Sequence, residues 1–153
     1  IAPKEHYSAL REIFRTQAFA SPYFEKYVEE ALFVMGYPED ALARMKTRFS
    51  PMVESSLTTL WEGWDIGSAK WGGGTNNHAW SGGGLTLLSQ YVAGIEPLEA
   101  GYKTVRITPR LGPLNFVAAQ VDTPLGLLRV EVRRQGKEIE LKYDAPEGMK
   151  MVE

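Results

Sequence analysis

The period of the hydrophobic pattern changes once along this chain, near Ile95, and this change constrains the fold more than any other feature. Before it, apolar residues recur every three or four positions, which is typical of helices packed on one face. After it, short runs alternate between apolar and polar residues and are separated by Pro and Gly, which is typical of antiparallel strands. We therefore predict an α+β chain, with helical hairpins over residues 1–95 and a small, incomplete antiparallel β-sandwich over residues 96–153.

Local signals predict the helices of the first part. The first covers about 4–15, the second begins at Pro22 behind the capping residue Ser21, the third begins at Pro38, and the fourth runs from about 84 to 93. The short connection between the second and third helices indicates an antiparallel pair. The predicted buried face of the second helix is an apolar stripe: Phe24, Tyr27, Val28, Ala31, Leu32 and Met35.

The second part contains a series of alternating runs that predict strands: 104–108, 116–121, 128–133, 137–143 and the start of another at 149. Gln135-Gly136 predicts a hairpin turn between two of them. A β-region of about 50 residues buries little surface for a domain that folds independently. Because the chain also begins at Ile1 rather than at Met, we expect it to be a piece of a longer protein.

Charge and composition exclude several classes of function. Lys and Arg total 17 against 19 Asp and Glu, and a net charge of -2 argues against nucleic-acid or membrane-surface partners. The absence of Cys excludes disulfides, thiolate nucleophiles and Cys-ligated metals, and two His cannot supply a usual metal shell. No apolar run approaches the ~18 residues of a membrane span. We therefore expect no metal, no cofactor, no nucleic acid and no membrane partner, while cellular location stays open.

One irregular segment, residues 58–80, concentrates the chemistry. It holds every Trp of the chain together with carboxylates, amides and an imidazole: Trp61, Glu62, Trp64, Asp65, Trp71, Asn76, Asn77, His78 and Trp80. Aromatic rings stack on the apolar faces of sugars, and the polar groups pair with sugar hydroxyls. A carboxylate between indoles should be desolvated, with a raised pKa suited to acid or base catalysis. On composition alone, Trp core anchors beside a capped or salt-bridged Glu62 explain the segment equally well.

Several motifs, in order and spacing, resemble the C-terminal part of bacterial α-L-rhamnosidases, glycoside hydrolase family 78. They are Thr58-Thr59-Leu60-Trp61-Glu62-Gly63-Trp64-Asp65, Asn77-His78-Ala79-Trp80-Ser81, Tyr91-Val92-Ala93-Gly94-Ile95-Glu96-Pro97, Gly101-Tyr102-Lys103 and Ile107-Thr108-Pro109-Arg110. The resemblance covers nearly the whole chain. It implies that the helices are the end of an (α/α)6 barrel and that the strands begin a C-terminal β-sandwich.

The resemblance also implies roles for particular residues. Family members invert the anomeric centre of terminal α-L-rhamnose. The Glu of the Thr-Thr-x-Trp-Glu motif, here Glu62, would be the general base, and the His of Asn-His, here His78, would contact sugar hydroxyls. Three tryptophans would shape the substrate pocket: Trp61, Trp64 and Trp80. The general acid would belong to an earlier part of the barrel, outside this chain.

One departure leaves the sugar preference open, because the family often has Arg directly after the Glu and this chain has Gly63. Two alternatives to an enzyme fragment also stay open: a non-catalytic carbohydrate-binding module, and a structural piece that braces a barrel. If the helices are part of a barrel, their apolar face lacks its cover in the isolated chain, and we expect that chain to self-associate.

Overall fold

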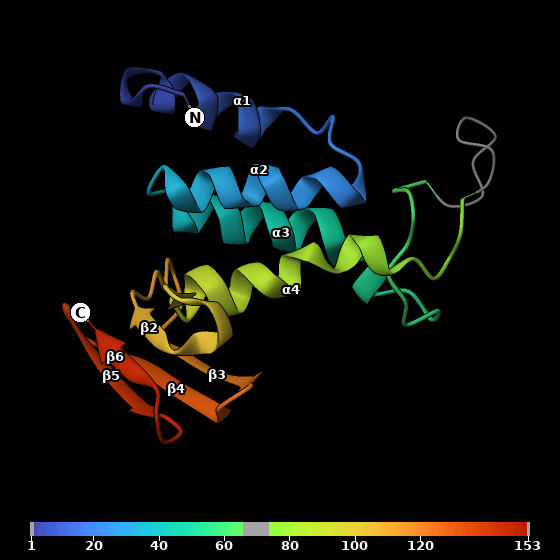
Figure 1. Ribbon diagram of the computed structural model, residues 1–153. Coiled ribbons are helices and arrows are strands. Elements are labelled where there is room, and N and C mark those ends of the chain that lie inside the picture. The colour runs from blue at the N-terminus through green and yellow to red at the C-terminus, as the bar shows by residue number, and fades with distance from the viewer. Residues whose placement is uncertain (1, 66–73, 153) are drawn as a thin grey trace. The chain divides into compact units, whose positions relative to one another are not determined.

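The computed structural model describes residues 2–65 and 74–152, and it is an α+β structure in which helices precede two small β-sheets, as predicted (Figure 1). Contacts divide the chain into two compact units, Ile1–Thr86 and Leu87–Glu153. These units are defined by contacts, and the domain division expected at residue 95 stays a prediction. Among the described residues, no helix combines the length and the apolar character that crossing a membrane would require.

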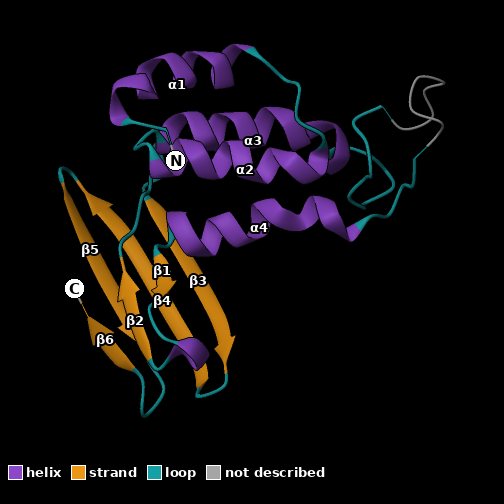
Figure 2. Cartoon of the chain, turned by 45° about the horizontal axis from the view of Figure 1, so that its top comes forward, coloured by secondary structure: helices purple, strands orange, loops and turns teal. Residues whose placement is uncertain are grey.

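The first unit is built around an antiparallel helical hairpin. A 3-10 turn, η1 (Lys4–His6), leads into α1 (Tyr7–Thr16), and α2 (Pro22–Val34) and α3 (Pro38–Val53) follow side by side (Figure 2). Ser21 caps α2, since its hydroxyl oxygen accepts a hydrogen bond from the Phe24 amide at 3.4 Å. Gly36 has a φ of +89°, which allows the tight turn between α2 and α3. The predicted antiparallel pair is therefore confirmed.

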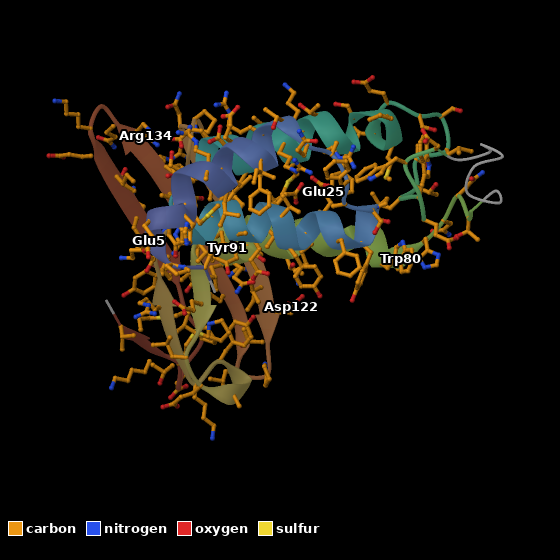
Figure 3. All side chains as sticks on the ribbon, turned by 90° about the horizontal axis from the view of Figure 1, so that it is seen from above. Glu5, Glu25, Trp80, Tyr91, Asp122 and Arg134 are labelled. Atoms are coloured by element: carbon orange, nitrogen blue, oxygen red, sulfur yellow. The ribbon has the colours of Figure 1, made fainter. Side chains whose placement is uncertain are left out.

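The buried face of α2 matches the predicted apolar stripe only in part, since Leu32 is fully buried but the aromatic members are not. Phe24 and Tyr27 are 58% and 47% exposed, whereas the carboxylates of Glu25 and Glu29 are fully buried. The prediction assumed that carboxylates face water, but α3 supplies a partner, because the Arg44 guanidinium pairs with Glu25 across the hairpin. Figure 3 shows Glu25 among the helices of this unit. The hairpin thus buries an ion pair where the pattern predicted aromatic rings.

The predicted fourth helix is present in three consecutive parts. A 3-10 turn, η3 (Ala79–Gly82), leads into α4 (Gly83–Leu87), which continues as one π-helical turn, η4 (Leu88–Val92). The helix ends at Val92 with Ala93 as its C-cap, and Gly94 follows with a φ of +77°, the left-handed conformation that commonly closes a helix. The predicted end of this helix is therefore confirmed.

The second unit consists of two three-stranded sheets, with strand orders β1-β2-β6 and β3-β4-β5 (Figure 2). The strands are β1 (Ile95–Pro97), β2 (Thr104–Ile107), β3 (Phe116–Thr123), β4 (Gly126–Gln135), β5 (Glu138–Asp144) and β6 (Lys150–Val152). A 3-10 turn, η5 (Ala100–Tyr102), separates the first two strands. Gly136 forms the predicted β4–β5 turn with a φ of +65°. The β2–β6 pair is parallel, unlike the other pairs, so the sandwich is not wholly antiparallel.

The core of the second unit draws side chains from both sheets. Its buried members are Ala93, Ile95, Val105, Leu111, Leu128, Val130 and Val132. On β4 the buried positions alternate with exposed charged residues, as the period of two in a strand requires. The alternating sequence pattern therefore predicted the buried face of β4 correctly.

Gly94 should be the glycine most sensitive to substitution in this unit. A Cβ at Gly94 would lie 2.2 Å from the carbonyl carbon of Thr108, and that neighbour is backbone, which cannot rotate away. We expect Gly94→Ala to lower the free energy of unfolding by ~2–4 kcal/mol. Gly136→Ala is the control, because φ is also positive but no described heavy atom lies within 4 Å, and about 1–2 kcal/mol is expected. Urea denaturation would contradict this account if both variants lost equal stability.

Candidate functional site

Two short segments pair through their backbones and position the predicted site. The amide of Glu62 donates to the Thr75 carbonyl at 3.0 Å, and the amide of His78 donates to the Leu60 carbonyl at 2.8 Å. Residues 60–62 and 75–78 therefore lie side by side although they are separated in sequence. This pairing brings the carboxylate and the imidazole that the sequence singled out to the same place.

The Glu62 carboxylate and the His78 imidazole are neighbours, with 3.8 Å between Oε2 and Nδ1. Each side chain is 35% exposed, so both groups are accessible without being fully solvated. Thr75 lies between them: its amide donates to Oε2 at 2.8 Å, and its hydroxyl oxygen is 3.1 Å from Oε2 and 2.9 Å from Nδ1. Carboxylate, hydroxyl and imidazole thus form one connected set.

The electrostatics of Glu62 are the reverse of the sequence expectation. Hydrogen bonds from the Thr75 amide and then from its hydroxyl hold the pKa of Glu62 below its ordinary value, against the opposing effect of burial. The nearby His78 acts in the same direction. The prediction of a raised pKa is therefore wrong, because it considered the flanking indoles and could not include these donors. A carboxylate that stays ionised is suited to accept a proton rather than to donate one.

Trp80 extends the site as an aromatic surface. Its ring centroid lies 4.4 Å from that of His78 and 5.4 Å from that of Tyr23 on α2. The Trp80 side chain is large and 41% exposed, and Figure 3 shows it at one end of the helical unit. A partly exposed indole beside an imidazole, with a carboxylate 3.8 Å from that imidazole, supplies the kinds of group that sugar recognition needs.

The two indoles that flank the carboxylate have different surroundings. Trp64 donates its Nε1–H to the Ala20 carbonyl at 2.7 Å, and its ring centroid lies 5.2 Å from that of Phe49 and 4.1 Å from the Arg48 guanidinium carbon. These contacts anchor Trp64 to the helical hairpin. The Nε1 atom of Trp61 is buried and has no hydrogen-bond partner among the residues that the structure describes. The pocket roles assigned to both indoles stay predictions.

The remaining residues to place in this segment are Trp71, Asp65 and Gly63. Trp71 lies outside the described residues, and Asp65 is exposed. A Cβ at Gly63 would meet no described heavy atom within 4 Å, so a side chain could be accommodated there. Over residues 2–65 and 74–152, no three His, Asp or Glu side chains come together as a metal site would require.

Sequence reasoning missed Thr75, which links the two polar groups of the site. The available signal was its position three residues before His78, within reach of the imidazole. That signal is weak without knowledge that residues 60–62 pair with 75–78, since only this pairing brings the Glu62 carboxylate to the same hydroxyl.

Comparison with known proteins agrees with the resemblance. Residues 94–152 match the family model described as bacterial alpha-L-rhamnosidase C-terminal domain. The predicted resemblance to the C-terminal part of such enzymes is therefore confirmed. None of the curated proteins compared matches the chain.

Solved α-L-rhamnosidase structures share the fold of most of the chain. The enzyme from Dictyoglumus thermophilum is 24% identical with a TM-score of 0.71, and the Streptomyces avermitilis enzyme complexed with L-rhamnose is 22% identical with a TM-score of 0.70; each match covers 83% of this chain. A GH78 family rhamnosidase of Bacillus sp. GL1 is 21% identical over 94% of the chain, with a TM-score of 0.76. The matches cover 13–16% of the lengths of these proteins.

Proposed function

We propose that this chain is the C-terminal part of an inverting glycoside hydrolase that releases terminal α-L-rhamnose from glycosides. The observation that carries the proposal is the position of the Glu62 carboxylate, 3.8 Å from the His78 imidazole, which in turn contacts the Trp80 ring. The lowered pKa of Glu62 is consistent with the role of a base. The match of residues 94–152 to the model of the rhamnosidase C-terminal domain supports the substrate class. The rhamnosidase folds that cover the chain support it further, and one of them was solved with L-rhamnose bound.

Inversion in one step needs two carboxyl groups on opposite faces of the sugar, ~6.5–9.5 Å apart. In the proposed step, Glu62 takes a proton from a water molecule while the water oxygen bonds to the anomeric carbon. The glycosidic carbon–oxygen bond breaks, and a carboxylic acid protonates the departing oxygen. Asp65 is three residues from Glu62 and exposed, which does not suit an opposite-face acid. We therefore assign the acid to a part of the enzyme outside this chain.

The binding roles follow from the same geometry. His78 would contact a sugar hydroxyl through its imidazole, and Trp80 would offer its ring to the apolar face of the rhamnose, including the methyl group that replaces a hydroxymethyl. Trp61 and Trp64 are proposed as pocket walls on the strength of the family motif. Of the three tryptophans, Trp80 has the best structural support because it directly contacts His78.

The chain by itself is expected to release no measurable phenol from an aryl α-L-rhamnoside, whereas the complete enzyme should release it readily. The reason is that the water-activating base cannot compensate for the missing protonation of the leaving group. Phenol release should be followed by absorbance for both proteins at matched concentrations. If the chain alone released phenol and Glu62→Gln abolished that release, the proposal that the general acid lies outside this chain would be contradicted.

Calorimetric titration with rhamnose separates the enzyme proposal from a carbohydrate-binding module. Binding by the chain, combined with full turnover of Glu62→Gln in the complete protein, would favour the module. Binding that accompanies loss of turnover in that variant would support the enzyme.

A further inference from the structure

The hydroxyl of Thr75 has two polar neighbours but only one hydrogen to give. Its oxygen lies 3.1 Å from Oε2 of Glu62 and 2.9 Å from Nδ1 of His78, both within hydrogen-bond distance. An ionised carboxylate can only accept hydrogen bonds. The single hydroxyl hydrogen must therefore point to Glu62 if that contact is to be favourable.

This assignment determines the protonation of the imidazole. With its hydrogen directed to Glu62, the Thr75 oxygen can only accept from His78, so Nδ1 must carry a hydrogen. The opposite assignment, in which the hydroxyl donates to Nδ1, would leave the Thr75 oxygen and Oε2 facing each other without a hydrogen between them. At 3.1 Å that contact would be repulsive unless Glu62 were protonated.

We propose that Thr75 is a positioning residue that aligns the Glu62 carboxylate and fixes neutral His78 as the Nδ1–H tautomer. The catalytic consequence of this inference rests on the function proposed above. In the neutral Nδ1–H imidazole, Nε2 is an acceptor, and it would accept a hydrogen bond from a hydroxyl group of the sugar. Thr75 thereby determines which sugar group His78 can recognise, namely one that donates a hydrogen.

The same arrangement distinguishes the two oxygens of Glu62. Among the described residues, the hydrogen bonds of this carboxylate all go to Oε2, which receives the Thr75 amide and hydroxyl. A carboxylate oxygen that already accepts two hydrogen bonds is the weaker base. The geometry therefore assigns Oε1 as the oxygen that takes the proton from water.

Nitrogen-15 NMR of the imidazole tests the tautomer directly in the chain as it stands. At a pH where titration shows the ring to be neutral, we expect Nδ1 of His78 to be protonated and Nε2 to be unprotonated. His6, the other histidine, is exposed and serves as an internal reference. Unprotonated Nδ1 in the unaltered chain would overturn the inference, and this measurement requires no variant to fold.

Variants at Thr75 test whether its hydroxyl determines the tautomer of His78. Thr75→Val keeps the backbone amide but removes the hydroxyl, and we expect the His78 ring to lose its Nδ1–H preference, whereas Thr75→Ser should keep it. Thr16→Val is the matched control, because its hydroxyl bonds within α1 to the Glu12 carbonyl. An unchanged His78 tautomer in Thr75→Val would overturn the inference.

Turnover in the complete enzyme separates failure of this inference from failure of the proposed function. Thr75→Val is expected to lower kcat about 10-fold, the effect of losing one hydrogen bond that aligns a charged group, with recovery in Thr75→Ser. An Nε2–H tautomer together with inactive Glu62→Gln would contradict only the role of Thr75. The Nδ1–H tautomer together with fully active Glu62→Gln would contradict the glycosidase function and leave the hydrogen-bond assignment intact.

Discussion

Replacing Glu62 with Gln in the complete enzyme is expected to lower kcat by about 10²–10⁴-fold, the usual contribution of a general base. The amide has nearly the same shape, and its oxygen can still accept from Thr75, so the local structure should be kept. An amide cannot take a proton from water, however, and the attacking oxygen would have to carry its proton into the transition state. Initial rates with an aryl α-L-rhamnoside measure the effect.

Asp65→Asn is the control for this substitution. It makes the same carboxylate-to-amide change three residues away, at an exposed position that we assign no catalytic part. Its kcat should stay close to that of the unaltered enzyme. Equal losses in the two variants would mean that the segment responds to charge in general, and that Glu62 has no special role.

The buried carboxyl of Glu29 on α2 should make the stability of the chain depend strongly on pH. The side chain is fully buried, and neither oxygen has a hydrogen-bond partner among the described residues. Burial, and then the charge of Glu25, raise the pKa of Glu29 to about 8, although Arg44 and Arg48 act in the opposite direction. The group is therefore neutral in the folded chain at neutral pH.

The sign of the effect follows from proton binding. The unfolded chain releases this proton near pH 4.5, whereas the folded chain keeps it until about pH 8. The contribution of Glu29 to stability is therefore greatest below about pH 4.5 and falls between pH 4.5 and 8. Over that range the unfolded chain is stabilised by ionising, whereas the folded chain keeps the proton. The loss amounts to at most about 5 kcal/mol by pH 9.

Glu29→Gln is expected to remove this loss and to make the chain more stable than the unaltered protein at pH 8–9. The two proteins should have similar stability near pH 4, where Glu29 is neutral in both the folded and the unfolded chain. Glu30→Gln, the same change at the next position of α2, is only partly buried and should keep the original pH dependence. Urea unfolding at several pH values gives the free energy of unfolding of the unaltered chain and of both variants. The account would be contradicted if this free energy changed with pH in Glu29→Gln as it does in the unaltered chain.

Features set by neighbouring residues could be predicted from the sequence. Ser21, Pro22 and Gly36 act on the backbone within a few positions, so the limits of α2 followed from capping and turn chemistry. The alternation along β4 likewise predicted its buried face. The burial of Glu25 on α2 could not be predicted, because it depends on Arg44 of another helix. The parallel β2–β6 pairing also depends on contacts distant in sequence, and β1 spans only Ile95–Pro97.

The candidate site also combines features that the sequence predicts with features that depend on contacts between distant segments. The motif resemblance identified Glu62 and His78, and the structure places them 3.8 Å apart. The resemblance could not identify Thr75 or the lowered pKa of Glu62, because both depend on the pairing of two loop segments. Self-association of the isolated chain stays a prediction, which the 89% exposure of Phe19 and the 77% exposure of Val53 support.

The most direct test of the central claim is the product that Glu62→Ala forms in the complete enzyme with azide present. Azide is a nucleophile that needs no deprotonation, and it would occupy the space left by the carboxylate. It would bond to the anomeric carbon while the general acid, which we assign to another part of the enzyme, protonates the leaving oxygen. We predict slow turnover without azide, restored by azide, with β-L-rhamnosyl azide as the product seen by proton NMR. An α-configured azide, or full turnover of the variant in water alone, would contradict the assignment of Glu62 as the base of an inverting reaction.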